Sequence, residues 1–168
     1  LDGGMGAIMF QEVRESRALA YSTWSWYLRG NRLGDEDQML AYIGTQGDKT
    51  PDALKLLIEL MKNPPKSMNH FKRAIKAMEN KYRTDVVDFK RILGQVEYWA
   101  DQGLAHDPRP AEFKALQETQ LEDIFKFVQS KVASQPLTFA LVGNKDKIDM
   151  KALKKLGVVE EVELESLF

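Results

Sequence analysis

The spacing of apolar residues limits the fold most, because it changes from helical spacing to alternation within a few residues. From Met5 to Arg17 apolar side chains recur close to helical spacing, which predicts a helix. From Tyr21 onward the period is two, which predicts a half-buried strand. Its apolar face would carry Trp24, Trp26 and Leu28, and its polar face Tyr21, Thr23, Ser25 and Tyr27.

The rest of the chain predicts a hairpin partner, then a run of helices, then more strands. Residues 39–46 read as the second strand, and helices are expected over 50–62, 67–82 and 84–102. We expect Thr84 to cap the last of these, with its apolar stripe inward: Val86, Ile92, Leu93, Val96 and Trp99. The segment His106–Pro110 is predicted to be a stiff connector.

A capping box of Thr119 and Glu122 predicts a further helix. Strands are expected at 137–142 and 158–164, on either side of a short helix after Asp149. This order predicts an α+β fold, a mixed, mainly antiparallel sheet covered on one side by helices. Residues 1–168 are the right length for a single domain.

The composition excludes several classes of function. A net charge of −1 provides no basic field for nucleic acid or an anionic membrane. No run approaches the roughly 18 apolar residues that span a bilayer, so the chain is predicted to be soluble. The absence of cysteine excludes disulfides and thiolate chemistry and fits either a reducing cytosol or an exported, for example periplasmic, protein.

The residues for self-contained catalysis are also missing. Hydrolytic zinc sites need two or three clustered ligands, but the only histidines, His70 and His106, are far apart in the sequence. No Gly-x-Ser-x-Gly elbow is present. Carboxylate pairs such as Glu160 and Glu161 are predicted to lie on solvated faces. No metal is therefore expected to bind to this chain alone.

Arg14 and Tyr21 are the candidate substrate-binding residues. Arg14 lies near the end of the first predicted helix and Tyr21 at the start of the strand that follows. A guanidinium and a phenol brought together can hydrogen-bond the carbonyls of an extended peptide or stabilise a tetrahedral intermediate. Alternatively, Arg14 pairs with Glu15 or another surface acid and Tyr21 only packs. Spacing alone favours this structural alternative.

The N-terminal segment carries a resemblance that changes this balance. It reads Leu1-Asp-Gly-Gly-Met-Gly-Ala-Ile-Met-Phe10-Gln-Glu-Val-Arg14-Glu-Ser-Arg-Ala-Leu-Ala-Tyr21-Ser. It resembles the Gly-Gly, Leu-Phe, Arg-Glu, Gly-Leu-Ala-Tyr segment of insulinase-type (pitrilysin-like) zinc peptidases and their mitochondrial-processing-peptidase relatives. Weaker similarity continues through 42–46, 140–145 and 156–159. Ala18 replaces the usual Gly but leaves Arg14 and Tyr21 in register.

The resemblance implies a division of labour between domains. In that family homologous α+β domains pair; one carries an inverted His-x-x-Glu-His zinc site and its partner carries the substrate-holding Arg and Tyr. Arg14 and Tyr21 are thus expected to hold peptide, while zinc comes from a homologous domain of the same polypeptide or a separate subunit. The chain alone is expected to be inactive. Such domains begin with further strands, so a C-terminal fragment is expected.

Two other functions stay open. A non-catalytic structural, assembly or peptide-binding homologue would keep the fold without the chemistry, and no His-x-x-Glu-His sequence would then occur in the parent chain or a neighbouring reading frame. An unrelated α+β hydrolase acting alone would instead show peptidase activity that chelators do not affect.

Overall fold

A computed structural model describes residues 20–163 of the chain. The helix predicted for Met5–Arg17, and with it Arg14, lies outside the described residues. Tyr21 lies inside them. No described helix is both long enough and apolar enough to cross a membrane.

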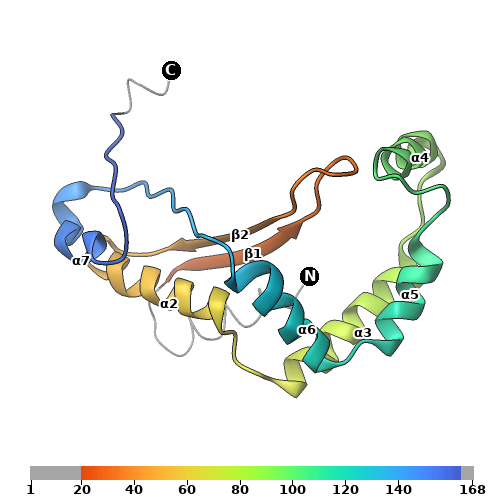
Figure 1. Cartoon of the computed structure of the whole chain (residues 1–168), viewed down its shortest axis with the longest axis horizontal. Helices are drawn as coiled ribbons and strands as arrows, with labels where there is room; N and C mark the ends of the chain where they lie inside the picture. Colours follow the sequence, from red (N-terminus) through yellow and green to blue (C-terminus); the bar gives the residue numbers. More distant parts are fainter. Residues whose placement is uncertain (1–19, 164–168) are drawn as a thin grey trace.

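Two strands form an antiparallel hairpin, as the sequence predicted (Figure 1). β1 (Ser22–Leu28) pairs with β2 (Gln38–Gly44) in a register that sets Ser25 opposite Ala41. At the hairpin turn the Asp37 carboxylate accepts hydrogen bonds from the Gly30 N–H (3.0 Å) and the Tyr27 hydroxyl (2.6 Å). These hydrogen bonds pair polar groups at the turn that have no partner in the hydrogen-bond ladder between the two strands.

The core lies on one face of this strand pair. It is built by α2 (Thr50–Lys62) and the π-helical turn η4 (Val128–Ala133), which continues α6 (Leu121–Phe127). Apolar residues at three- and four-residue spacing point inward from both elements. The buried members of this cluster are Leu56, Leu57, Leu60, Met61, Val128 and Val132. Helix α2 starts with Pro51 in its first turn and ends before Asn63, as predicted.

The two faces of β1 are reversed relative to the prediction. Met39, Ala41 and Ile43 of β2 pack against the core, and the pairing register sets Ile43 and Ala41 opposite Thr23 and Ser25. The small polar side chains of β1 therefore lie on the helix-covered face. On the other face Trp24 and Trp26 are 43% and 50% exposed. Alternation separates two faces, but packing decides which face is covered.

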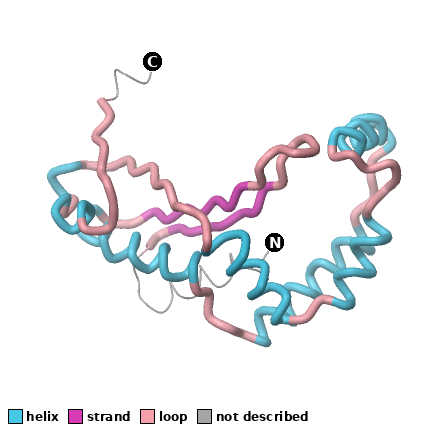
Figure 2. The backbone as a smooth tube through the Cα atoms, in the orientation of Figure 1, coloured by secondary structure: helices cyan, strands magenta, loops and turns pink. Residues whose placement is uncertain are grey.

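Helices α3 (Met68–Thr84) and α5 (Arg109–Glu118) lie side by side and lead away from the sheet (Figures 1 and 2). α3 agrees with the prediction, and its cap Ser67 accepts a hydrogen bond from the His70 N–H at 3.3 Å. α5 was not predicted. It begins inside the supposed connector, where the Asp107 carboxylate accepts the Arg109 N–H at 2.9 Å.

Helix α4 (Ile92–Asp101) follows the 3-10 turn η3 (Phe89–Arg91) and starts later than predicted. The chain at 85–88 is not helical, and the Asp88 side chain caps η3 by accepting the Lys90 N–H at 2.8 Å. The predicted inward stripe is also wrong, since Val86 and Leu93 are 84% and 71% exposed. Gly103, with φ of 72°, ends the helix as predicted.

The hairpin tip fixes the end of α4. The Leu33 N–H donates to the Asp101 carbonyl at 2.7 Å, and Gln102 Nε2 donates to the Gly30 carbonyl at 2.5 Å. Two segments some 70 residues apart in sequence are joined in this way, as Figure 1 shows at the end of the strands. No local sequence pattern indicates such a contact.

The capping box of α6 lies one residue beyond the predicted one. The Gln120 N–H donates to the Asp123 carboxylate at 3.0 Å, while the Thr119 hydroxyl donates back to the Ala115 carbonyl of α5. Because α5 ends directly before Thr119, the Thr119 hydroxyl bonds to a carbonyl of α5 and does not cap α6.

The C-terminal region confirms the short helix but not the strands. The 3-10 turn η2 (Gly47–Lys49) lies against a second one, η5 (Lys145–Lys147). α7 (Met150–Lys154) is capped by Asp149, which accepts the Ala152 N–H at 3.0 Å. Residues 137–142 and 158–163 form no strand. Among the described residues the fold is therefore α+β with a two-stranded antiparallel sheet, narrower than the mixed sheet predicted.

Candidate functional site

Tyr21 lies at the open end of the strand pair, immediately before β1. Its N–H donates to the Gly44 carbonyl at 2.8 Å, which extends the hairpin contact by one residue. The side chain is 69% exposed. The Tyr21 side chain is therefore open to solvent.

Gln46 determines how the Tyr21 phenol can act. Its Nε2 donates to the Tyr21 hydroxyl oxygen at 2.8 Å. A phenol that accepts from an amide keeps its own O–H free to donate. No local sequence pattern points to Gln46 as the hydrogen-bond donor to Tyr21, because Gln46 follows the paired strand β2 rather than β1.

Gly44 leaves room for a second phenol at this end of the hairpin. A Cβ on Gly44 would lie 3.0 Å from the Tyr42 hydroxyl and 2.9 Å from Ser22 Oγ. Tyr42 in turn stacks on Trp24 with ring centroids 5.4 Å apart. The backbone at Gly44 is therefore closely approached by polar side chains. We call Tyr21, Gln46 and Gly44 the phenol site.

Among residues 20–163 no group of three or more His, Asp or Glu side chains is placed to hold a metal ion. His70 lies on α3 and His106 in the loop before α5.

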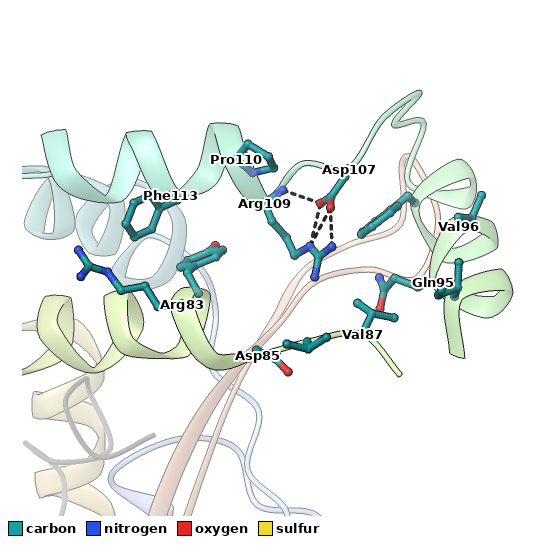
Figure 3. Close-up of a pocket in the computed structure, with 13 residues that line it drawn as sticks. Arg83, Asp85, Val87, Gln95, Val96, Asp107, Arg109, Pro110 and Phe113 are labelled. Carbon is teal, nitrogen blue, oxygen red and sulfur yellow. Dashed lines mark hydrogen bonds and ion pairs between the residues drawn. The ribbon is translucent and has the colours of Figure 1, made fainter. Parts of the chain in front are cut away.

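A groove lies between α3, α4 and α5 (Figure 3) and has a volume of about 720 Å³. Its walls are mostly apolar and include Val96, Trp99 and Phe113. On one side the Asp107 carboxylate binds the Arg109 guanidinium through two nitrogens, at 2.9 and 2.5 Å. The same guanidinium lies 5.4 Å from the Trp99 ring centre. Ile92, Val96 and Trp99 of α4, which were predicted to be buried, line this groove instead.

The two charged groups at the groove, Asp107 and Arg109, each stabilise the ionised form of the other. The hydrogen bonds from Arg109 lower the pKa of the Asp107 carboxyl, and that carboxylate raises the pKa of the Arg109 guanidinium. Both groups are partly exposed, so the pair fixes geometry more than it adds stability.

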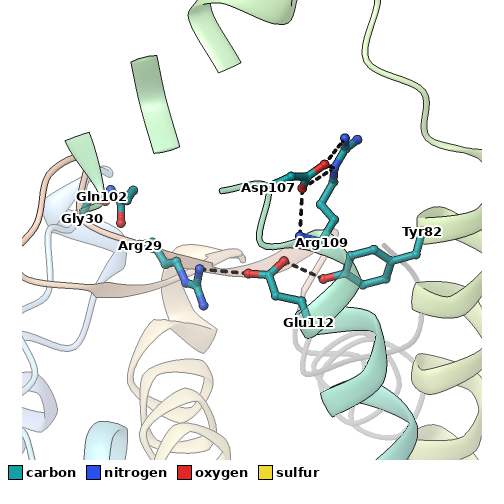
Figure 4. A network of polar contacts seen from close by, with 7 residues as sticks. All are labelled: Arg29, Gly30, Tyr82, Gln102, Asp107, Arg109 and Glu112. Atoms are coloured by element: carbon teal, nitrogen blue, oxygen red, sulfur yellow. Dashed lines mark hydrogen bonds and ion pairs between the residues drawn. The ribbon is translucent and has the colours of Figure 1, made fainter. Parts of the chain in front are cut away.

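A polar network connects the hairpin to the same helices (Figure 4). The Glu112 carboxylate of α5 accepts the Tyr82 hydroxyl at 2.9 Å and an Arg29 Nη1–H at 3.3 Å. Burial and the hydrogen bond to Glu112 raise the pKa of Tyr82 to about 12. Sequence reasoning missed this network because its members come from three distant segments.

Comparison with known proteins identifies the fold. The chain resembles the crystal structure of a peptidase M16 inactive domain from Pseudomonas fluorescens, with a TM-score of 0.58 and 20% sequence identity. The match covers 77% of this chain and 31% of that one, so the chain spans about a third of the length of its structural relative. No family model and no curated protein matches the sequence. The resemblance to insulinase-type peptidases is thus confirmed at the level of the fold.

Proposed function

We propose that this chain is the substrate-holding, non-zinc domain of an insulinase-type zinc metalloendopeptidase. Two observations support the proposal: the sequence of residues 1–22, and the fold shared with a peptidase M16 inactive domain. Arg14 and Tyr21 hold the backbone of an extended peptide. Zinc and the general base come from a homologous domain, in the same polypeptide or in a separate subunit.

The observation that carries the chemical part is the hydrogen bond from Gln46 to Tyr21. The amide occupies an acceptor site of the phenol oxygen at 2.8 Å and leaves the phenol O–H to donate outward. An O–H donor held in advance can stabilise the negative oxygen of a tetrahedral intermediate, because no reorganisation is needed when the charge develops. The ring is 69% exposed, so a substrate can reach it.

Arg14 has a different role in this proposal. Its guanidinium is always charged and presents several N–H donors in one plane. It can therefore bind a peptide carbonyl while Tyr21 binds the reacting oxygen. Neither residue breaks a bond, so the isolated chain is inactive.

The proposal is tested by mixing the chain with its zinc-bearing partner and measuring kcat/KM on a fluorogenic peptide. Tyr21→Phe removes one hydroxyl and is expected to lower kcat/KM by about 10²–10³-fold, the usual effect of losing one such donor. Arg14→Ala is expected to lower it as well. Tyr98→Phe, on α4, is the matched control. Unchanged values for Tyr21→Phe and Arg14→Ala together would leave the structural or assembly homologue as the better account.

Two substitutions of Gln46 test how the phenol is positioned. Gln46→Glu replaces the amide donor with an acceptor, so the phenol would donate to the carboxylate and lose its outward O–H. The expected loss of kcat/KM matches that of Tyr21→Phe. Gln46→Met leaves the phenol unbound but free to donate, so the expected loss is smaller. Equal effects of the two substitutions would contradict the positioning role.

A further inference from the structure

Helix α3 differs in charge from the rest of the chain. It carries five lysines and arginines and a single acidic residue, Glu79. Because the whole chain has a net charge of −1, the residues outside α3 are together acidic. The helix is therefore a local basic element on a protein that has no general basic field.

Three of these cations lie on one stripe of the helix. Lys72, Lys76 and Arg83 follow one another at distances of four and seven residues, a spacing that places side chains on the same side of a helix. All three are exposed. Glu79 lies between them and pairs with Lys76 at 3.7 Å, whereas Lys72 and Arg83 form no ion pair with residues 20–163. Two charges of the stripe are therefore available to a partner.

Two hollows open between α3 and α5 beside this stripe. Arg83 and Phe113 line the groove of about 720 Å³, and Lys72 and Leu116 line a second hollow of about 440 Å³. Phe113 and Leu116 are three residues apart on α5, so the two hollows follow one another along the same side of the helix pair. Figure 3 shows Arg83 beside Phe113, with the guanidinium 5.9 Å from the ring centre. We call this side of α3 and α5, with Lys72, Lys76 and Arg83, the basic seam.

The groove adds exposed apolar surface to the basic seam. Ile92 and Val96 in its wall are 50% and 49% exposed. Apolar surface of this kind with charged groups at its rim is typical of interaction sites. All residues that line the groove come from 82–113, a continuous stretch that the structure describes. Its volume is in the range of sites that enclose a ligand or the side chains of a partner.

We propose that the basic seam binds an acidic amphipathic helix of another protein. α3 and α5 lie side by side, and a third helix placed along their seam can pack its side chains into the groove between them. A partner helix has the same rise as α3, about 1.5 Å per residue. Its carboxylates, at spacings of four and seven residues, therefore meet Lys72, Lys76 and Arg83 in register. Its apolar residues enter the two hollows, as in other complexes of a helix with a groove.

The distribution of charge favours a protein helix over a nucleic acid. Phosphates follow one another without interruption along a nucleic acid, so Glu79 within the stripe and Asp107 at the groove would repel part of any phosphate chain. A helix can place carboxylates opposite the cations alone and apolar residues opposite the hollows. The proposal does not depend on Arg14, Tyr21 or a zinc-bearing partner, so it and the proposed peptidase role can fail independently.

Fluorescence polarisation of the full chain with a labelled synthetic peptide tests the binding. The peptide is a helix of about four turns with glutamate at positions i, i+4, i+7 and i+11 and leucine on the adjacent stripe. We expect saturable binding that weakens as salt is added, and about tenfold weaker binding when glutamine replaces the glutamates. A peptide of the same composition in scrambled order is expected to bind far less. No saturable binding, or equal binding of the scrambled peptide or of oligothymidylate, would overturn the proposal.

Two matched pairs of variants test the position of the site. Arg83→Glu reverses a charge of the basic seam and is expected to weaken the peptide by about tenfold, whereas Lys81→Glu makes the same change in the last turn of α3 on the opposite side of the helix and should have no effect. Ile92→Asp places a carboxylate in the groove and should also weaken binding, while Leu93→Asp, at a position 71% exposed and outside the groove, should not. Circular dichroism checks that all four variants are folded. Equal effects within both pairs would refute the site.

Discussion

Replacing Leu57 with alanine tests where the core of this protein lies. Leu57 is 4% exposed and packs in the cluster formed by α2 and η4. Truncation of a buried leucine to alanine costs about 2–5 kcal/mol, because transfer free energy is lost and a cavity remains. Leu93→Ala is the same chemical change on α4, where the side chain is 71% exposed. We expect this control to change the free energy of unfolding by less than about 0.5 kcal/mol.

The assay is urea unfolding followed by circular dichroism. For a chain of this length a loss of about 3 kcal/mol corresponds to a fall in Tm of roughly 6–12 °C. The m-value should stay the same for both variants, since the area exposed on unfolding hardly changes. If Leu93→Ala destabilised the protein as much as Leu57→Ala, the apolar stripe of α4 would be buried. The sequence-based prediction would then be right and the structural account wrong.

Three further predictions concern single groups. Gly103→Ala is expected to cost about 1–2 kcal/mol in thermal unfolding because its φ is 72°, whereas Gly94→Ala, helical with nothing within 4 Å of a new Cβ, should stabilise by about 0.5–1 kcal/mol. Arg109 lowers the pKa of Asp107 below 3.8, so the stability from this pair is present above that pH and lost below it. Asp107→Asn removes the titrating carboxyl, so the free energy of unfolding in urea should fall less between about pH 5 and about pH 3 in this variant than in the wild type. The pKa of Tyr82 is raised from 10.0 to about 12, so an ultraviolet titration of wild type minus Tyr82→Phe should show a transition near the higher value, and one near the lower value would contradict the burial of Tyr82.

Local elements were predictable from the sequence because local chemistry determines them. The alternation of β1 and β2, the Pro51 start of α2, the Ser67 cap of α3 and the Asp149 cap of α7 each follow from short-range preferences. The hairpin and the α+β class were therefore correct.

Features that depend on distant segments were not predictable. The covered face of β1 follows from which side α2 occupies, and the alternation alone does not contain that information. The α4 stripe has helical periodicity, yet Ile92, Val96 and Trp99 line a groove and Leu93 is 71% exposed. The predicted strands at 137–142 and 158–164 have suitable residues, but a strand needs a neighbour for its backbone groups, and the described residues 137–142 and 158–163 form none.

The candidate site also combines a residue that the sequence predicted with a partner that it did not. Tyr21 was identified from its position at the start of a strand and from the resemblance of residues 1–22 to a peptidase family. Its partner Gln46 was missed, because the two residues meet only when β1 and β2 pair. The groove pair Asp107 and Arg109 is separated by one residue and had a local signal in the Asp-Pro-Arg sequence, which was interpreted only as a connector.

Inhibition by a phosphinic peptide, which mimics the tetrahedral intermediate, tests the central claim about Tyr21 most directly. The chain and its zinc-bearing partner would be mixed, and the inhibition constant compared between wild type, Tyr21→Phe and the control Tyr98→Phe. In the proposed role the phenol donates to the charged oxygen of the intermediate, so Tyr21→Phe should weaken the phosphinate by about the same 10²–10³-fold factor by which kcat/KM falls, with the control unchanged. Equal inhibition constants for all three proteins would show that Tyr21 does not contact the reacting oxygen.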